Sequence, residues 1–267
     1  MKIKLVKELI EKKKYIELQE SLSQVQETNL AKILTELDAP STLLVFRILP
    51  KDLAVEVFAH LEKNKQLEIL DSFTDKEIGI IIEELFFDDM IDLIEEMPAN
   101  IVKKILAQSK DDERELINQF LMYPSQSAGS LMTIEYVELR KHMRVKEALD
   151  QIKRIGLNKE TIYTCYVTDQ DRFLEGVVSL RSLVISDEEE LIENLMDRDV
   201  IKVQTHDDQE EVAKIFQGYG FLALPVVDTE GRLTGIITVD DIIAVIEQEA
   251  TEDFQLMAAM SPSEEDY

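Results

Sequence analysis

A stretch of 13 residues in the second half of the chain occurs twice without a gap, and this repeat constrains the fold more than any other feature. It runs from 167 to 179 and again from 226 to 238. Three residues recur in register within it: Asp169, Leu174 and Gly176 match Asp228, Leu233 and Gly235. The motif Leu131-Met132 likewise recurs as Leu195-Met196. The second half must therefore contain two copies of one folding unit.

Each copy combines strand signals with helix signals. In the second copy, runs rich in β-branched residues alternate with segments of helical periodicity, and residues typical of turns separate them. The expected elements are a strand at 200–203, a helix at 209–217, a strand at 222–227, a turn at 228–231, a strand at 233–238 and a helix at 240–248. The repeat therefore predicts a mixed α/β module that is duplicated.

The first half of the chain, up to about residue 121, has helical periodicity throughout. Prolines stand where new helices would begin, most clearly at Pro50 and Pro98. When these prolines are aligned, the apolar positions around them coincide. The matching residues are Val45, Phe46, Leu49, Leu53, Val57 and Phe58 in one copy and Leu93, Ile94, Met97, Ile101, Ile105 and Leu106 in the other. Each helix pair leaves an apolar face that only its neighbour covers, so we expect an all-α, superhelical, solenoid-like domain.

Turn-forming residues interrupt the helical pattern at 123–130. We place a domain boundary in this junction. A length of 267 residues agrees with about two domains, each large enough to bury a core of its own. The expected organisation is an acidic helical domain at 1–128, a first α/β copy at 129–194 and a second copy at 195–250.

The charge of the chain narrows the range of its partners. There are 55 Asp and Glu against 29 Lys and Arg, a formal net charge of −26, while 45% of the residues are hydrophobic. That apolar content is typical of a folded protein. The excess of carboxylates repels phosphate backbones and anionic headgroups, which argues against nucleic acid and membrane surfaces as partners. Hard cations are the partners that such a surface favours.

Cysteine usage and the terminal sequence indicate the compartment. Cys165 is the single cysteine, so neither an intramolecular disulfide nor a multi-thiolate metal site can form, which indicates a reducing environment. The N-terminal residues lack the apolar core and the cleavage site of a signal peptide. The longest uncharged run, 116–134, is broken by polar residues and Pro124. We therefore expect a soluble chain on the cytoplasmic side.

The second copy of the repeat, at 222–228 and 231–241, closely resembles the core of a cystathionine-beta-synthase (CBS) domain. Two copies would make a CBS-domain pair, or Bateman module. The junction at 121–133, the acidic segment at 87–94 and the tail at 249–253 together resemble the cytosolic part of the MgtE family of magnesium channels and transporters. This resemblance extends over nearly the whole chain.

The resemblance implies a regulatory protein rather than an enzyme. It implies the cytosolic Mg²⁺-sensing part of a magnesium channel or transporter, at the cytoplasmic face of the cell membrane, in which Mg²⁺ bridges acidic surfaces of the two domains and favours a closed pore. It further implies a homodimer through the CBS domains, a transmembrane domain in the same polypeptide, and the start of a connecting helix at 251–267. The alternative is an adenine-nucleotide-sensing CBS module that regulates another transporter or an enzyme.

Asp88 and Asp92 are spaced i, i+4, which puts both carboxylates on one face of a helix and makes half of a site for Mg²⁺, a hard cation that prefers oxygen ligands. The other interpretation is that acids in this place only favour a helix N-terminus. It is the resemblance to the MgtE family, and not the spacing, that favours the metal site. The resemblance adds further candidate metal ligands: Glu56, Asp208, Glu210, Asp241, Glu249, Glu252 and Asp253. For Asp241 the alternative is helix capping, and for the acids of the tail it is a solvated helix face.

The resemblance also implies ATP as a second ligand. CBS pairs often bind adenine nucleotides through a Gly-x-x-[Ser/Thr]-x-x-Asp pattern, in which the hydroxyl lies near phosphate and the carboxylate on the ribose diol. The second copy matches this pattern with Gly235, Thr238 and Asp241, whereas the first has Gly176, Ser179 and Ser182 and so lacks the carboxylate. The implied nucleotide-binding residues are Ser179, Arg181, Phe221 and Thr238.

The sequence contains no convincing catalytic motif. Residues 218–223 match a dinucleotide-binding fingerprint, but a helix precedes them and a strand follows, which is the reverse of the required order. The three histidines, His60, His142 and His206, are dispersed, and Cys165 has no base near it in the sequence. We therefore expect no enzymatic activity.

Overall fold

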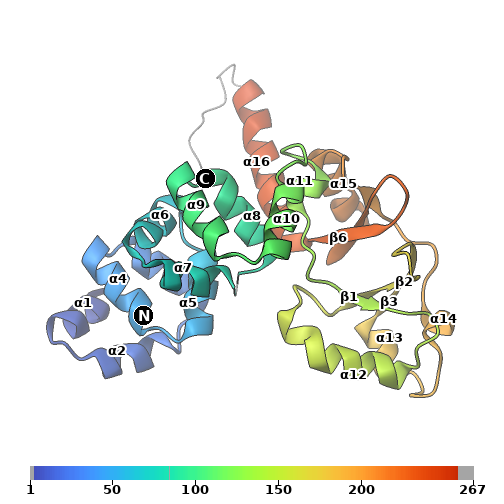
Figure 1. Ribbon diagram of the computed structural model, residues 1–267, viewed down its shortest axis with the longest axis horizontal. Helices are drawn as coiled ribbons and strands as arrows, with labels where there is room; N and C mark the ends of the chain where they lie inside the picture. Colours follow the sequence, from blue (N-terminus) through green and yellow to red (C-terminus); the bar gives the residue numbers. More distant parts are fainter. Residues whose placement is uncertain (1–2, 84, 258–267) are drawn as a thin grey trace. The chain divides into compact units, whose positions relative to one another are not determined.

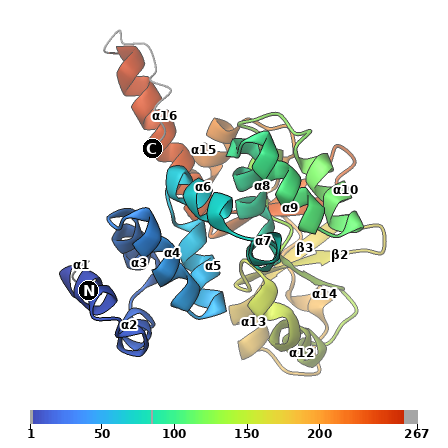
Figure 2. The same cartoon turned by 60° about the vertical axis from the view of Figure 1, so that its left-hand side comes forward.

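The computed structural model describes residues 3–83 and 85–257, and the chain divides into two compact units, residues 1–118 and 119–267 (Figures 1 and 2). The side chains at 111–113, at 248 and at 252–257 lie outside this description. Each unit has a hydrophobic core of its own. Within the described residues, no helix is both long enough and apolar enough to cross a lipid bilayer.

The first unit consists of short helices, as the periodicity of the sequence predicts. Their bounds are α1 Ile3–Glu11, α2 Tyr15–Leu22, α3 Glu27–Thr35, α4 Ala39–Ile48, α5 Lys51–Ala59, α6 Lys63–Ser72, α7 Asp75–Ile82, α8 Phe87–Glu96, α9 Ala99–Gln108 and α10 Asp111–Phe120. Helix α3 packs against α5, α4 against α6, and α7 against α9, so helices contact the next but one along the chain. This stacking confirms the superhelical, solenoid-like domain (Figure 1).

Prolines begin helices in this unit where the sequence predicted them. Pro50 is the N-cap residue of α5 and Pro98 is that of α9, with φ angles of −53° and −56°. Proline suits these places because its ring fixes φ near such values. Of the 12 apolar positions that coincide when the prolines are aligned, all but Leu53 and Leu106 are buried. The sequence repeat is thus a repeat of core positions.

The second unit contains two three-stranded sheets of the same topology. The strands are β1 Val137–Leu139, β2 Thr164–Thr168 and β3 Leu174–Ser179 in the first sheet, and β4 Val203–Gln204, β5 Ala223–Val227 and β6 Leu233–Thr238 in the second. In each sheet the first strand pairs in parallel with the second, which pairs antiparallel with the third. Even the register agrees, since Val167 pairs with Gly176 and Val226 with Gly235. The duplicated α/β module is confirmed.

Helices cover these sheets in equivalent places. They are α11 Ala128–Leu131, α12 Val145–Ile155, α13 Leu180–Ile185, α14 Ile192–Leu195, α15 Gln209–Tyr219 and α16 Val239–Met257, with a short 3₁₀ helix, η1, at Gly156–Asn158. The strand predicted at 200–203 was wrong in position, because β4 begins only at 203. Val200 and Ile201 line a cleft between the two copies instead of extending the ladder.

Each sheet is completed by backbone from the segment that leads into the other copy. Thr133, near the start of the first copy, exchanges two hydrogen bonds with Ile236 on β6, at 2.8 and 2.9 Å. Asp197, near the start of the second copy, exchanges two hydrogen bonds with Val177 on β3, at 2.9 and 2.8 Å. The repeated Leu-Met motif immediately precedes both of these crossings. The two copies therefore form one interlocked unit.

Glycine is required at both crossings. A Cβ atom on Gly235 would lie 2.6 Å from the carbonyl oxygen of Thr133 and 2.8 Å from Sδ of Met132. A Cβ atom on Gly176 would lie 2.8 Å from the carbonyl oxygen of Asp197. Any larger residue would push the crossed segment away from the strand, because backbone atoms cannot yield as a flexible side chain can.

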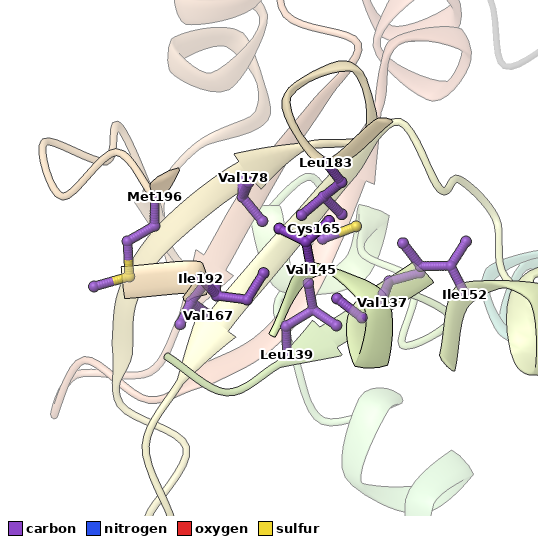
Figure 3. Close-up of a cluster of buried hydrophobic side chains, with 11 residues drawn as sticks. Val137, Leu139, Val145, Ile152, Cys165, Val167, Val178, Leu183, Ile192 and Met196 are labelled. Carbon is purple, nitrogen blue, oxygen red and sulfur yellow. The ribbon is translucent and has the colours of Figure 1, made fainter. Parts of the chain in front are cut away.

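The core of the first copy lies between its sheet and the helices that pack on it (Figure 3). Its buried side chains are Val137, Leu139, Val145, Ala148, Ile152, Cys165, Val167, Val178, Leu183, Ile192 and Met196. Burial raises the pKa of the Cys165 thiol to about 12. Cys165 is therefore a packing residue, as the sequence indicated. A second cluster joins the two copies and consists of Tyr136, Tyr166, Ala223, Leu233 and Ile236.

Gly235→Ala is expected to lower the free energy of unfolding by about 1–3 kcal/mol, because the added methyl group overlaps the crossed backbone. Gly218→Ala is the control, since open space surrounds Gly218 inside α15 and alanine favours a helix there by up to about 1 kcal/mol. Urea denaturation of the parent and both variants measures the difference. Equal stability of the two variants would contradict the close approach at the crossing.

Candidate functional site

A cleft of about 720 Å³ lies between the two copies in the second unit. Its walls from the first copy include Tyr163, Thr164, Tyr166, Val177, Ser179 and Arg181, and its walls from the second include Asp197, Asp199, Val200, Ile201 and residues 219–225. Apolar and aromatic side chains predominate, with a few charged and hydroxyl groups among them. This composition and size are typical of sites for small organic ligands.

Two stacked aromatic rings belong to this cleft. The ring centroids of Tyr219 and Phe221 are 5.3 Å apart, and the ring planes differ by 7°. Gly220 stands between them with φ of +66° and ends α15 by donating its N–H to the carbonyl oxygen of Phe216 at 2.8 Å. Glycine adopts this left-handed conformation without strain, so the helix end determines how the two rings are presented. Tyr219 is 64% exposed, which leaves its ring accessible to a planar group.

The start of α13 carries the hydroxyls predicted for nucleotide binding. Oγ of Ser179 accepts a hydrogen bond from the backbone N–H of Ser182 at 3.0 Å, and the two hydroxyl oxygens are 2.8 Å apart. At the start of α16, the hydroxyl of Thr238 donates to a carboxylate oxygen of Asp241 at 2.6 Å. The two pairs are structurally equivalent. Ser182 therefore occupies the place that a carboxylate holds in the second copy.

The cleft brings together three of the four predicted nucleotide residues. Ser179, Arg181 and Phe221 line it, whereas Thr238, the last residue of β6, does not. Sequence analysis missed Tyr219, although it lies in the segment 218–223 that the dinucleotide fingerprint singled out. It also missed Asp197 and Asp199, which line the same cleft. An anionic ligand would meet these two acids as well as the guanidinium of Arg181.

Tyr166 forms part of the cleft floor and is fully buried. Its hydroxyl oxygen has no hydrogen-bond partner among the described residues. The neighbouring Tyr136 differs, because its hydroxyl accepts a hydrogen bond from the Arg172 guanidinium at 3.2 Å. The two rings meet edge to face, with centroids 5.8 Å apart. Burial raises the pKa of the Tyr166 phenol far above its usual range.

The acidic pair predicted in the first unit lies on α8. Asp88 and Asp89 stand in the first turn of this helix, as the helix N-terminus interpretation also requires. Asp92 is exposed and lines a hollow of about 150 Å³ together with Asp89 and Glu96. Lys63 also lines this hollow and forms a salt bridge with Glu96. Sequence analysis identified Asp88 and Asp92 and missed the lysine, which comes from a different helix.

Three of the other predicted acids have partners described within the second unit. Asp208 is the N-cap residue of α15 and accepts a hydrogen bond from the backbone N–H of Glu210 at 2.9 Å. Glu210 forms a salt bridge with Lys214 at 2.8 Å, which raises the pKa of that lysine. Glu249 accepts a hydrogen bond from the side chain of Gln209 at 2.9 Å. Helix capping and hydrogen bonds or ion pairs with neighbouring side chains therefore engage these three acids.

The remaining candidates are divided between the two units. Glu56 is exposed on α5 in the first unit, and Asp241 belongs to α16 in the second. Glu252 and Asp253 also belong to α16, with side chains outside the described part of the chain. Within the described residues, no three His, Cys, Asp or Glu side chains are arranged to hold a metal ion. A cation at these surfaces would keep several water ligands, which Mg²⁺ does readily.

Each of the two units contains a segment that matches a known protein family. Residues 25–126 match the family profile described as MgtE intracellular N domain, and residues 192–248 match that of the CBS domain. The chain is 38% identical over 249 residues to the magnesium transporter MgtE of Thermus thermophilus, an alignment that covers 91% of this chain and 55% of that protein. The chain spans about half the length of the curated relatives that it matches.

Two solved structures resemble the chain over nearly its whole length. One is the soluble part of a magnesium transporter, with a TM-score of 0.87 and 30% identity, covering 93% of this chain and 98% of that one. The other is the cytosolic domain of the Mg²⁺ channel MgtE in complex with ATP, with a TM-score of 0.84 and 36% identity, covering 90% of this chain and 98% of that one. Both similarities span the two units.

Tyr166→Phe is expected to leave the free energy of unfolding unchanged or to raise it by about 1 kcal/mol at neutral pH, because it removes a buried hydroxyl without a partner. Tyr136→Phe is the control and should cost about 1 kcal/mol, since the hydrogen bond from Arg172 to the Tyr136 hydroxyl is lost.

The pH dependence gives a second measurement. The raised pKa keeps Tyr166 neutral in the folded chain while the unfolded chain ionises near pH 10, so the parent loses stability above that pH. Tyr166→Phe should lose less stability there. Parallel pH profiles of parent and variant would contradict the burial of this phenol.

Proposed function

The chain belongs to the MgtE family of magnesium transporters, and we propose that it is the cytosolic, Mg²⁺-sensing region of such a transporter. Its similarity to transporters and to a channel, over both units, supports this proposal over an enzymatic role. The half of the relatives' length that this chain does not cover would hold the membrane domain. Helix α16 would lead toward it.

The observation that carries the sensing proposal is the acidic face of α8 in a chain of net charge −26. With Mg²⁺ plentiful, hydrated ions would bridge Asp88 and Asp92 to acids of the second unit such as Asp241, and the bridged state would favour a closed pore. With Mg²⁺ scarce, the like charges repel one another and the bridged state is lost. Because Mg²⁺ keeps most of its water at such surfaces, each bridge is weak and responds to ordinary cytosolic concentrations.

A second copy of the chain is the proposed partner of the CBS pair. Val184 on α13 is 65% exposed and Ile243 on α16 is 51% exposed. The two residues occupy equivalent positions, five residues after Ser179 and five after Thr238. Ile185, at 78% exposure, extends the apolar patch on α13. Burial of these side chains in a homodimer would remove them from water.

The variant Asp88→Ala/Asp92→Ala tests the sensing proposal. A single site stabilises the folded chain by about 1.4 kcal/mol when Mg²⁺ is at ten times its Kd. We expect the double variant to lose at least half of the parent's Mg²⁺-dependent stabilisation, although its metal-free form is more stable because repulsion is smaller. Thermal unfolding against Mg²⁺ at constant ionic strength measures both effects.

Asp71→Ala/Asp75→Ala is the matched control. Both aspartates are exposed in the first unit, and their loss changes the net charge by the same amount without touching α8. This control should keep the parent's response to Mg²⁺. A response of Asp88→Ala/Asp92→Ala equal to that of the parent would show that general screening, and not bridging at α8, explains the effect.

We further propose that the cleft of the second unit binds an adenine nucleotide. The stacked rings of Tyr219 and Phe221 offer a surface for a base, and Arg181 offers a cation for phosphate. Ser182 cannot supply the carboxylate that would accept hydrogen bonds from a ribose diol. The nucleotide should therefore bind weakly.

Ser182→Asp is expected to tighten ATP binding by about 10- to 100-fold, since a charge-assisted hydrogen bond contributes about 1.5–3 kcal/mol. Ser182→Asn is the control, because it has the shape of aspartate without the charge and should gain much less. Calorimetry at fixed free Mg²⁺ measures the three affinities. Tight binding by the parent with no gain in Ser182→Asp would place the nucleotide elsewhere, for instance around Thr238 and Asp241.

A further inference from the structure

The beginning of the chain is basic, although the chain as a whole is strongly acidic. The first 14 residues contain six lysines and two glutamates, a net charge of +4. Residues 15–267 contain 23 basic and 53 acidic residues, a net charge of −30. The sign of the charge therefore reverses within one short segment at the end of the first unit.

The structure exposes this segment on α1, on the turn that follows it and at the start of α2, and these helices lie at one end of the helical stack (Figure 2). We call the exposed residues here the N-terminal basic surface: Lys4, Leu5, Lys7, Lys12, Lys13, Lys14, Tyr15 and Ile16. Lys12 pairs with Glu8 and Lys14 with Glu17. Among the described residues, Lys4, Lys7 and Lys13 form no salt bridge.

Apolar side chains are exposed beside these lysines. Ile16 is 76% exposed, Leu5 is 43% exposed and Tyr15 is 39% exposed. Tyr15 and Ile16 directly follow the run Lys12-Lys13-Lys14, and Leu5 stands between Lys4 and the core residue Val6. Val6 and Leu9 hold α1 onto the unit by its other face.

A second basic stretch, in the other unit, differs from this surface in how many of its cations form salt bridges. Residues 140–154 also contain six basic and two acidic residues. Four of these cations, Arg140, Lys141, Arg144 and Lys153, form salt bridges with carboxylates. Salt bridges within the protein thus use most of the positive charge in that stretch. On the N-terminal basic surface, three of the five lysines form no salt bridge with a described residue and remain available to an external anion.

We propose that the N-terminal basic surface docks on an anionic lipid bilayer. Lysines attract acidic headgroups, while exposed isoleucine, leucine and tyrosine side chains insert at the interface between headgroups and acyl chains. The charge of −26 does not prevent this, because the Debye length is about 8 Å at physiological ionic strength and distant carboxylates are screened. The whole-chain argument against membrane surfaces therefore does not apply to this segment.

The combination of charge and apolar exposure favours lipid over an acidic protein surface. Carboxylates would satisfy the lysines and leave Ile16 in water, whereas a bilayer accommodates both kinds of side chain. This inference goes beyond Mg²⁺ sensing and does not depend on it, since vesicle binding can be measured in the absence of divalent cations.

Flotation of the whole chain with vesicles tests the proposal. We expect binding to vesicles of phosphatidylcholine with phosphatidylserine, no binding to phosphatidylcholine alone, loss of binding at high salt, and no competition by millimolar inorganic phosphate. Each lysine near an anionic surface contributes about fivefold to the partition coefficient, so Lys4→Glu/Lys7→Glu/Lys13→Glu should lower it at least about 100-fold. Ile16→Ser should lower it several-fold without any change of charge.

Lys32→Glu/Lys76→Glu/Lys103→Glu is the matched control, because these three exposed lysines lie elsewhere in the first unit and their reversal changes the net charge equally. It should keep the parent's partition coefficient. Equal loss in both triple variants would overturn the proposal in favour of a general charge effect. Absence of vesicle binding by the parent would also overturn the proposal. A larger hydrodynamic radius of Lys4→Glu/Lys7→Glu/Lys13→Glu would in that case assign these lysines to a contact with an acidic surface of the protein itself.

Discussion

The crossed backbone pairing in the second unit is the interaction on which the rest of that unit depends. Strands of two to six residues form two small sheets, and each sheet receives an additional pair of hydrogen bonds from the segment leading into the other copy. Gly176 and Gly235 permit the contact because they carry no side chain. The cleft exists because the two copies are held at this fixed separation. Loss of either crossing would therefore affect both sheets and the site between them.

Much of this fold could be predicted because its signals are local or repeated. Residues that match in the 13-residue sequence repeat also occupy matching positions in the two sheets, because β2 pairs with β3 in the same register as β5 with β6. Pro50 and Pro98 stand at helix starts because proline fixes φ there. The crossings were beyond prediction, since nothing local indicates that Thr133 pairs with Ile236, about a hundred residues away. The misplaced strand has the same cause, because Val200 and Ile201 have strand-like side chains but find a cleft instead of a partner strand.

In the candidate sites, too, the residues that local sequence signals indicate were predicted, whereas contacts between distant segments were not. Helical spacing placed Asp92 on one face with Asp88, and the family resemblance made it a candidate ligand, but the hollow beside it is also lined by Lys63, which another helix supplies. Asp208, Glu210 and Glu249 have hydrogen-bond or ion-pair partners within the chain, so a cation would compete with those partners for the same oxygen atoms. Such competition would keep metal affinity low, as the proposed sensing of Mg²⁺ requires, because the ion must leave when its concentration falls. A tight, preformed Mg²⁺ site would stay occupied at all Mg²⁺ concentrations and could not respond to a change in them.

Helix α16 is both part of a core and a projecting rod. Ile242 and Val245 near its start are buried, while its backbone continues without a break to Met257. From Val245 to Met257 the rise of about 1.5 Å per residue gives a length of about 18 Å. The start of α16 is fixed in the core, so a tilt of the helix by about 10° about this start would displace its far end by about 3 Å. If a ligand bound to the second copy as proposed, a sub-ångström repacking at the buried start of α16 would become a displacement of a few ångströms at the far end.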